Sequence, residues 1–210
     1  RARGSGYTRG MDDKQHAREA ALAARDRIPP ADRLQRSAEA CRKLESHFAP
    51  LLQPGSLLAV YAAMKSEVDL RALVDAACAR GWRVCFPCMT RDAAAPPSPD
   101  RMEFHCVEPK QLADARAGFL AHPLRTWPSG ALEREGYSPV EPSQIDGVVV
   151  PLVAFDAAGR RIGYGGGNYD SLLASLRPDA AVAGVAFAEQ RLARVPTEPH
   201  DRPLPTVIVA

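Results

Sequence analysis

The sequence has no long apolar run and little net charge. No segment approaches the roughly 18–20 consecutive apolar residues that span a bilayer, so we expect no membrane partner. The 27 basic and 25 acidic residues leave a net charge of +2, which gives no broad positive field for nucleic acid. Residues 1–10 contain basic side chains but no apolar core like that of a signal peptide. We therefore expect a flexible leader over residues 1–10 and a cytoplasmic location.

Cysteine is also sparse, and its five copies are an odd number. An odd count in a chain without an export signal favours free thiols over disulfides. Cys85 and Cys88 form a C-x-x-C pair, but a Pro/Ala-rich loop follows them instead of the helix that normally stabilises a reactive thiolate. A zinc site needs two more ligands, and the nearby candidates His105 and Cys106 are adjacent on a strand, so they point to opposite faces. We interpret the pair as buried strand residues.

The remaining pattern is that of a single α/β domain over residues 11–210. Its 46% hydrophobic and 25% charged residues are ordinary for a globular protein. A short apolar strand over residues 56–61, a helix over 70–80 and a strand over 83–86 form a strand–helix–strand unit, which argues for a parallel sheet. Residues 145–155 are the most apolar run in the chain, as a central strand buried on both faces requires. The predicted fold is a three-layer α/β/α arrangement with a mostly parallel central sheet.

Four further expectations concern boundaries. An aspartate pair at positions 12 and 13 can cap a first helix over residues 12–27. Pro87 is expected to stop the strand that precedes it, because proline has no backbone donor. The alternation over residues 102–107 is typical of an edge strand. Residues 118–144 contain four prolines, three glycines and scattered charges without a period, so we expect an irregular segment that covers the sheet edge.

The most unusual stretch follows the central strand. Residues 159–170 read GRRIGYGGGNYD, with four glycines among five consecutive residues after Ile162. Inside a regular element each glycine costs about 0.5–1 kcal/mol relative to alanine, whereas a tight loop can use their exposed amides, backed by arginine, to bind an anion. The stretch lacks the Lys-Ser/Thr of a P-loop and the position of a dinucleotide fingerprint. It is a different phosphate loop or, alternatively, a tight turn whose glycines serve packing.

Charged residues elsewhere fit an anion site. Asp170 would lie beside a phosphate, which is unfavourable unless a cation such as Mg²⁺ bridges the two anions; the alternative is an ordinary helix N-cap. Asp201 is a second isolated acid in a loop bounded by prolines. Lys14 and Arg18 are four residues apart and share a helical face, where like charges cost a few tenths of a kcal/mol unless an anion lies between them. Their alternative is a solvated basic face.

Together these motifs resemble the 5-formyltetrahydrofolate cyclo-ligase family, also called methenyltetrahydrofolate synthetases. The resemblance runs from Lys14 to the C-terminus, and its glycine-loop block is highly specific. It implies a Rossmann-like fold of the NagB/RpiA/CoA-transferase type. The resemblance rests on Lys14 and Arg18, on Glu67 and Val68, on residues 150–170, on Phe187 and Gln190, and on residues 196–201.

What the resemblance implies is an ATP-dependent cyclisation with small-molecule substrates, carried out by a monomer or at most a weak homodimer. The formyl oxygen of 5-formyltetrahydrofolate attacks the γ-phosphate of MgATP, and the neighbouring aryl amine nitrogen then attacks the phosphorylated imidate. Phosphate leaves, giving 5,10-methenyltetrahydrofolate and ADP. Such phosphoryl transfer depends mostly on positioning and charge neutralisation, and the substrate supplies both attacking atoms.

The resemblance also implies roles for individual residues. Glu67 would accept hydrogen bonds from the pterin ring, beside an apolar wall of Ala62 and Met64. The catalytic candidates are Arg161 and Tyr169, and the Mg²⁺ ligands are Asp170 and Asp201. The ATP site comprises Lys14, Arg18, Arg161, Ile162, Gly163, Tyr164, Gly165, Gly166, Gly167, Asn168 and Tyr169. The folate site comprises Ala62, Met64, Glu67, Tyr164, Gly165, Gly166, Gly167 and Asn168.

Three departures from the family pattern concern substrate preference and rate more than the fold, and rival functions also stay open. The family usually has an aromatic residue at the position of Asn168 and a basic residue at the position of Ser171. Its Glu-Pro element has two possible counterparts, Glu133 and Glu141-Pro142. The rivals are a paralogue that uses the same MgATP site on another small molecule, a non-catalytic nucleotide-binding module, and a sugar-phosphate isomerase on a related scaffold.

Overall fold

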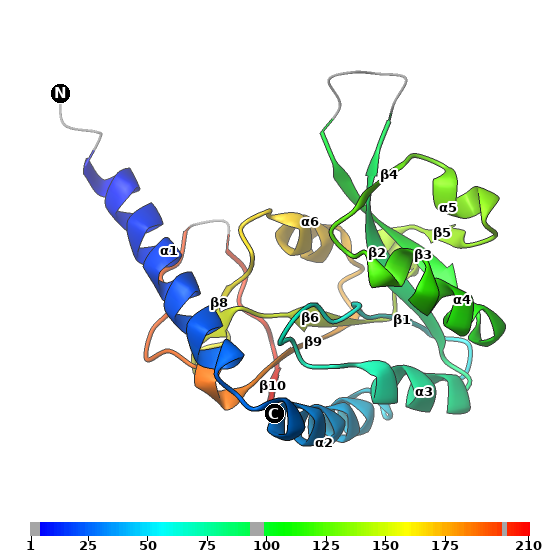
Figure 1. The fold of residues 1–210 in the computed structure, drawn as a ribbon, viewed down its shortest axis with the longest axis horizontal. Helices are drawn as coiled ribbons and strands as arrows, with labels where there is room; N and C mark the ends of the chain where they lie inside the picture. The colour runs from blue at the N-terminus through cyan, green and yellow to red at the C-terminus, as the bar shows by residue number, and fades with distance from the viewer. Residues whose placement is uncertain (1–4, 93–98, 199–200) are drawn as a thin grey trace.

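The centre of the molecule is a mostly parallel sheet (Figure 1). The computed structural model describes residues 5–92, 99–198 and 201–210. In this part of the chain the strand order is β10-β9-β6-β1-β2-β3-β5, and β4 pairs with β2 outside this path. Only β3 runs antiparallel to its neighbours, β2 and β5. The strands are β1 (Leu57–Ala59), β2 (Arg83–Arg91), β3 (Arg101–Val107), β4 (Thr126–Pro128), β5 (Ser138–Val140), β6 (Gly147–Pro151), β9 (Ala181–Ala186) and β10 (Val207–Val209).

Helices cover both faces of this sheet, so the predicted three layers are confirmed. Figure 1 shows α2 and α3 on one side and α6 on the other. Along β6, Val149 belongs to the apolar cluster under α2 and α3, whereas Val148 and Val150 belong to the cluster under α6. A strand that is buried on both faces has no polar alternation, which explains the continuous apolar run. The helices are α1 (Ser5–Asp26), α2 (Pro30–Phe48), α3 (Arg71–Ala79), α4 (Leu112–Ala117), α5 (Ala131–Arg134) and α6 (Asn168–Ser175), with 3₁₀ turns η1 (Pro109–Gln111), η2 (Phe119–Ala121), η3 (Pro142–Gln144) and η4 (Ala188–Gln190).

Strand β2 does not stop at Pro87, contrary to the prediction. On one side, β1 pairs with β2 only as far as Cys85. On that same side β4 begins its pairing at Met89. Pro87 lies in the gap between these two partners while pairing continues with Phe104 of β3, so its missing N–H leaves no ladder bond unmade.

The segment after β3 is more regular than expected. Residues 118–144 include β4, α5 and β5, and β5 pairs with β3. Strand β3 is therefore an inner strand, and the edge-strand prediction was wrong. Strands of three residues are too short to show a period in the sequence.

The first helix begins at Ser5 and not at the predicted aspartates. No proline interrupts residues 5–13, and glycine inside a helix costs only about 1 kcal/mol. Residues 5–10, expected as part of a leader, thus form the first turns of α1, and residues 1–4 lie outside the described part. No helix among the described residues is long and apolar enough to cross a membrane.

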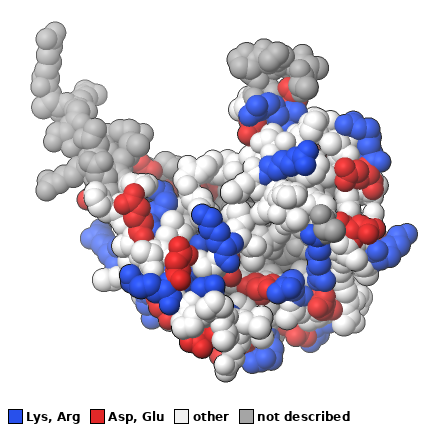
Figure 2. Space-filling model, in the orientation of Figure 1, with Lys and Arg blue, Asp and Glu red and all other residues white. Residues whose placement is uncertain are grey.

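The five cysteines are free thiols, as predicted. Cys85 packs in the cluster under α6, and Cys88 packs in the cluster on the opposite face of the sheet. Their side chains therefore point away from each other, and the C-x-x-C pair forms neither a redox pair nor a shared metal site. On the face that Figure 2 shows, basic and acidic side chains are interspersed.

Candidate functional site

Three loops meet where the parallel strands end. One follows β1 and spans residues 62–67, and a second is the glycine loop, residues 163–167. The glycine loop leaves a two-stranded hairpin of β7 (Ala154–Phe155) and β8 (Arg161–Ile162), which comes directly after β6. The third loop leads from η4 to β10, and the structure describes its residues 191–198 and 201–206. Ligands of open α/β sheets bind at this carboxyl edge, and helix α1 packs against β7 and η4 beside it.

Helix α1 directs its basic side chains toward these loops. Lys14 Nζ lies 2.8 Å from Glu198 Oε2 and 2.7 Å from Asp201 Oδ2. Arg18 Nε donates a 2.9 Å hydrogen bond to the carbonyl of Gly163 in the glycine loop. Both side chains are half-buried and bind loops of the site, so the alternative of a solvated basic face was wrong.

Arg25 is a third residue of this helix that contacts the site, and it was not among the site residues predicted from the sequence. Its side chain is only 1% exposed. Nε donates to Ser66 Oγ at 2.9 Å, and both terminal nitrogens lie 3.1 Å from the hydroxyl oxygen of Tyr164. Ser66 in turn donates to a carboxylate oxygen of Asp26. The available signal was spacing, because Arg25 follows Arg18 by seven residues and so lies on the same face two turns later.

Glu67 connects the loop after β1 to the glycine loop. Its carboxylate is 7% exposed and accepts hydrogen bonds from Met64 N at 2.8 Å and from the Tyr164 hydroxyl at 2.7 Å. Burial raises the pKa of Glu67, although these two bonds and the charge of Arg25 act in the opposite direction. Burial and the nearby Glu67 carboxylate raise the pKa of Tyr164 to about 12, so the phenol keeps its proton and remains the donor to Glu67. Ala62 and Met64 are half-buried in the same loop.

The glycine loop needs glycine at two of its positions for conformational reasons. Gly165 has φ of 100° and Gly167 has φ of 68°, a region that L-residues rarely adopt. A side chain on Gly165 would also begin 3.5 Å from Arg18 Nη2. Gly167 is the N-cap of α6, so the alternative assignment of Asp170 as an N-cap was wrong.

Asp170 pairs with a buried arginine. Arg161 donates from Nη2 to Asp170 Oδ1 at 2.5 Å and from Nη1 to the carbonyl of Arg202 at 2.5 Å. Since Arg202 directly follows Asp201, Arg161 brings the two predicted metal ligands to the same part of the site. Two carboxylates with oxygen donors suit Mg²⁺, which usually takes one or two protein carboxylates together with phosphate oxygens.

The other predicted site residues lie around this loop. Tyr169 packs against the apolar cluster under α6, and burial followed by the charge of Glu67 raises its pKa. Asn168 opens α6, with its amide nitrogen 3.8 Å from Met89 Sδ. Ile162 is buried in a small apolar cluster with Ala21 of α1. It therefore holds α1 against the hairpin by packing.

Asp156 is, besides Glu67, a second buried acid near the site. Unlike Glu67, it was not among the predicted site residues. Its carboxylate closes the turn of the hairpin by accepting bonds from Ala158 N and Arg160 N, and it reaches Val195 N of the third loop. Its Oδ2 lies 2.6 Å from Arg160 Nε. Asp156 thus fixes the base from which the glycine loop starts.

A sequence model of the 5-formyltetrahydrofolate cyclo-ligase family matches residues 10–210. The chain belongs to this family. A cyclo-ligase relative from Mycolicibacterium smegmatis (strain ATCC 700084 / mc(2)155), named 5-formyltetrahydrofolate cyclo-ligase, is 30% identical over 188 residues, which are 90% of this chain and 89% of the relative. A relative of the same name from Escherichia coli (strain K12) is 40% identical over 67 residues, 31% of this chain and 37% of the relative.

Solved structures of this cyclo-ligase family support the fold. A 5,10-methenyltetrahydrofolate synthetase from Mycoplasma pneumoniae superposes with a TM-score of 0.68 at 21% identity and covers 93% of this chain and 98% of its own. A 5,10-methenyltetrahydrofolate synthetase from Aquifex aeolicus gives a TM-score of 0.65 at 23% identity and covers 93% and 89%. The chain is therefore an enzyme of the cyclo-ligase class on the three-layer fold that the sequence predicted.

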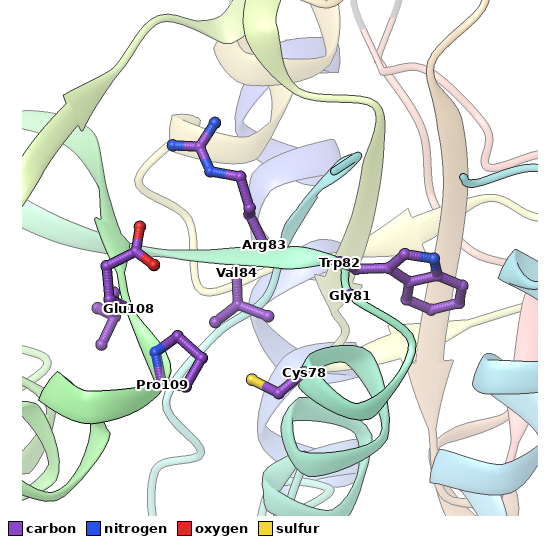
Figure 3. A pocket seen from close by; sticks show the side chains of 8 residues that line it. Cys78, Gly81, Trp82, Arg83, Val84, Glu108 and Pro109 are labelled. Atoms are coloured by element: carbon purple, nitrogen blue, oxygen red, sulfur yellow. The ribbon is translucent and has the colours of Figure 1, made fainter. Parts of the chain in front are cut away.

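A separate surface pocket of about 160 Å³ lies away from this site (Figure 3). It is found at the amino end of β2, opposite the strand ends where the cyclo-ligase loops meet. Figure 3 shows Val84, Cys78 and Pro109 around one space, with the Arg83 side chain on the other side of the strand. Its position excludes it as part of the loop site.

Proposed function

We propose that this cyclo-ligase family member converts 5-formyltetrahydrofolate and ATP into 5,10-methenyltetrahydrofolate, ADP and phosphate. The observation that carries the proposal is the hydrogen bond from Tyr164 to Glu67. This bond joins the glycine loop to the loop after β1 at the point where the cations of α1 arrive. A folate-recognition carboxylate and a phosphate loop are thereby parts of one site.

The reaction has two balanced steps. The formyl oxygen attacks the γ-phosphorus of ATP, an O–P bond forms, and the bond to the bridging oxygen breaks so that ADP leaves. The aryl amine nitrogen then attacks the activated formyl carbon, the amine proton passes to solvent, and the C–O bond breaks with release of phosphate. The former formyl oxygen leaves as one oxygen of that phosphate.

The chain supplies positive charge for the first step. Lys14, Arg18 and Arg161, with the backbone amides of residues 165–167, would bind the triphosphate, and Arg161 would stabilise charge on the transferring phosphoryl group. Asp170 and Asp201 would hold Mg²⁺, which neutralises phosphate charge and orients the phosphates when it is bound.

The loop after β1 supplies the pteridine side of the site. Glu67 is held by two donors, Met64 N and Tyr164, which fix its orientation. Its remaining acceptor positions would receive the pterin N–H groups, while Ala62 and Met64 provide apolar contact. Tyr169 keeps its proton because burial raises its pKa, so in this mechanism it acts as a hydrogen-bond donor and not as a base.

The direct test is turnover. Purified protein with 5-formyltetrahydrofolate and MgATP is expected to generate methenyltetrahydrofolate absorbance and an equal amount of ADP. Glu67→Gln is expected to raise KM for the folate by roughly 10–100-fold, because hydrogen bonds to a charged group are worth about 1.5–3 kcal/mol, with little change in KM for ATP. The matched control is Glu189→Gln, an exposed carboxylate that pairs with Arg36.

Other outcomes point to the rival functions. ADP release or MgATP-dependent thermal stabilisation without methenyltetrahydrofolate would indicate a paralogue that uses another small molecule. Absence of both signals would indicate a non-catalytic module whose glycine loop holds another anion.

A further inference from the structure

A cluster of metal-ligand residues lies on the face of the sheet opposite the glycine loop. Cys88 of β2 is the register partner of Glu103 in β3, so the two side chains share a face. His105 follows Glu103 by two residues and shares that face too. Cys88 packs in the cluster under α2 and α3. The fourth member, Glu133, lies in helix α5. It directly follows Leu132, which is buried in the apolar cluster under α2 and α3.

The imidazole of His105 is the unusual member of this cluster. It is 1% exposed, and its Nε2 makes no hydrogen bond within the described part of the chain. The nearest acid oxygen, Glu133 Oε1, lies 3.4 Å from Nε2, but the two atoms do not form a hydrogen bond. On the other side of the ring, Nδ1 lies 3.4 Å from Cys88 Sγ. Buried polar atoms almost always have a partner, so an unpaired nitrogen that faces a carboxylate requires an explanation.

The two carboxylates make a cation the simplest explanation. One ligand atom from each of Glu103, His105 and Glu133 lies within 4.8 Å of the others. Among the described residues, no lysine or arginine forms an ion pair with either glutamate. Like charges at such a distance are unfavourable without a positive partner.

We propose that Glu103, His105 and Glu133 bind a divalent transition metal ion, with Zn²⁺ as the best fit. One imidazole nitrogen and two carboxylate oxygens are Zn²⁺ ligands, and three protein ligands leave a fourth position for water. Mg²⁺ prefers oxygen ligands alone. A metal ion at Nε2 would place the ring proton on Nδ1, so that Nδ1–H donates to the sulfur of Cys88. A hydrogen bond of this kind from the other ring nitrogen orients metal-binding histidines.

The ion would link α5 to β3 across residues that the sequence alone left irregular. It is distinct from the proposed Mg²⁺ site, because the two sites lie on opposite faces of the sheet. Cys88 and Met89 are successive on β2 and therefore point to opposite faces. Met89 contacts Asn168 of α6, on the side of the glycine loop. The inference therefore does not depend on the proposed reaction.

The test uses the full chain after removal of metals by a chelator. Titration with Zn²⁺ in a calorimeter is expected to reveal one site that Glu133→Gln and Glu103→Gln each weaken by at least about 10-fold. Glu135→Gln, which changes an exposed acid in the same segment, is the matched control and is expected to bind like the original chain. Asp170→Asn separates the two sites and is expected to retain this Zn²⁺ binding.

Two further readouts complete the test. Zn²⁺ is expected to raise Tm in the original chain and in Glu135→Gln, but not in Glu133→Gln. Co²⁺ is expected to give visible absorption without a thiolate charge-transfer band, since Cys88 is a hydrogen-bond partner and not a ligand. Equal Zn²⁺ affinity in Glu133→Gln and the original chain, or loss of binding only in Asp170→Asn, would overturn the proposed site. Equal stabilisation by Mg²⁺ would overturn its assignment to a transition metal.

Discussion

Replacing Asp156 should destabilise the protein more than any exposed carboxylate would. Its side chain is fully buried and accepts bonds from Val195 N and Ala158 N at 2.9 Å, from Arg160 N at 3.2 Å and from Arg160 Nε at 2.6 Å. Val195 is itself 1% exposed, so water cannot readily replace the lost acceptor. The carboxylate joins the hairpin turn to the third loop of the site.

The size of the effect follows from these partners. An unsatisfied buried donor costs about 1–3 kcal/mol, and removal of one partner from a buried ion pair costs about 3–5 kcal/mol. These contributions overlap because Arg160 takes part in both, so Asp156→Ala should lower the free energy of unfolding by about 3–5 kcal/mol. In a chain of this size each kcal/mol changes Tm by about 2–4 °C, which gives a decrease of about 6–20 °C. Asp156→Asn keeps one oxygen and should lose about half as much.

Thermal and urea unfolding at pH 7 measure these differences. Asp100→Ala is the control, because Asp100 forms surface contacts with Arg91 and Thr126 only, and it should change Tm little. A Tm for Asp156→Ala that equals that of Asp100→Ala would refute the reasoning. So would a loss of stability without any change in the protection of the Val195 amide from hydrogen exchange.

The pH dependence provides an independent check on the same carboxylate. Burial alone would raise the pKa of Asp156, but the bonds from Val195, Arg160 and Ala158 outweigh burial and hold it below the usual 3.8. A lowered pKa in the folded state adds stability above the unfolded-state pKa, and that stability is lost as the pH falls through the folded value. The stability difference between the original chain and Asp156→Asn should therefore be constant from about pH 5 to 7 and shrink below about pH 4. A difference that stays constant down to pH 3 would contradict this assignment.

Three further predictions concern the glycine loop and its surroundings. Lys14→Ala should weaken ATP binding by roughly 10-fold, the loss expected for one charge-assisted contact, and leave folate binding intact; equal loss of both ligands in a titration would indicate misfolding. Asp170→Asn should abolish the Mg²⁺-dependent part of ATP affinity in calorimetry, and an unchanged Mg²⁺ dependence would remove Asp170 from the metal role. Gly159→Ala should lower Tm measurably, because Gly159 has φ of 74° and an added Cβ would collide with the carbonyl oxygen of Leu204; an unchanged Tm would show that the turn can relax.

The parts of the fold that depend on local pattern were predictable. The continuous apolar composition of residues 145–155 predicts a strand that is buried on both faces. The spacing of Lys14 and Arg18 reports a shared helical face, and the structure places both side chains on loops of the site. Gly81, at the end of α3, has φ of 75°, as a glycine after a helix C-cap should.

The parts that depend on distant partners were not predictable. Pro87 is tolerated inside β2 because β1 ends its pairing before Pro87 and β4 begins its pairing after it. The residues around Pro87 do not predict either boundary. Strand β3 is internal only because β5, three residues long, pairs with it. The contact between His105 and Glu133 depends on that same folding of residues 118–144, so the sequence alone does not place Glu133 beside His105.

The charges of the site suggest how the proposed reaction begins. Lys14 lies between Glu198 and Asp201, and Arg161 pairs with Asp170. Buried charges are costly without partners, so these side chains need protein partners before any ligand arrives. MgATP carries both signs of charge. Its phosphates could therefore pair with Lys14 and Arg161, while its metal ion could bind Asp170 and Asp201. Ligand binding would then give Lys14, Arg161, Asp170 and Asp201 new partners of opposite charge, which explains why the proposed phosphate site contains acids. On this argument Asp170→Asn should release Arg161, and ATP should then bind with much weaker dependence on Mg²⁺.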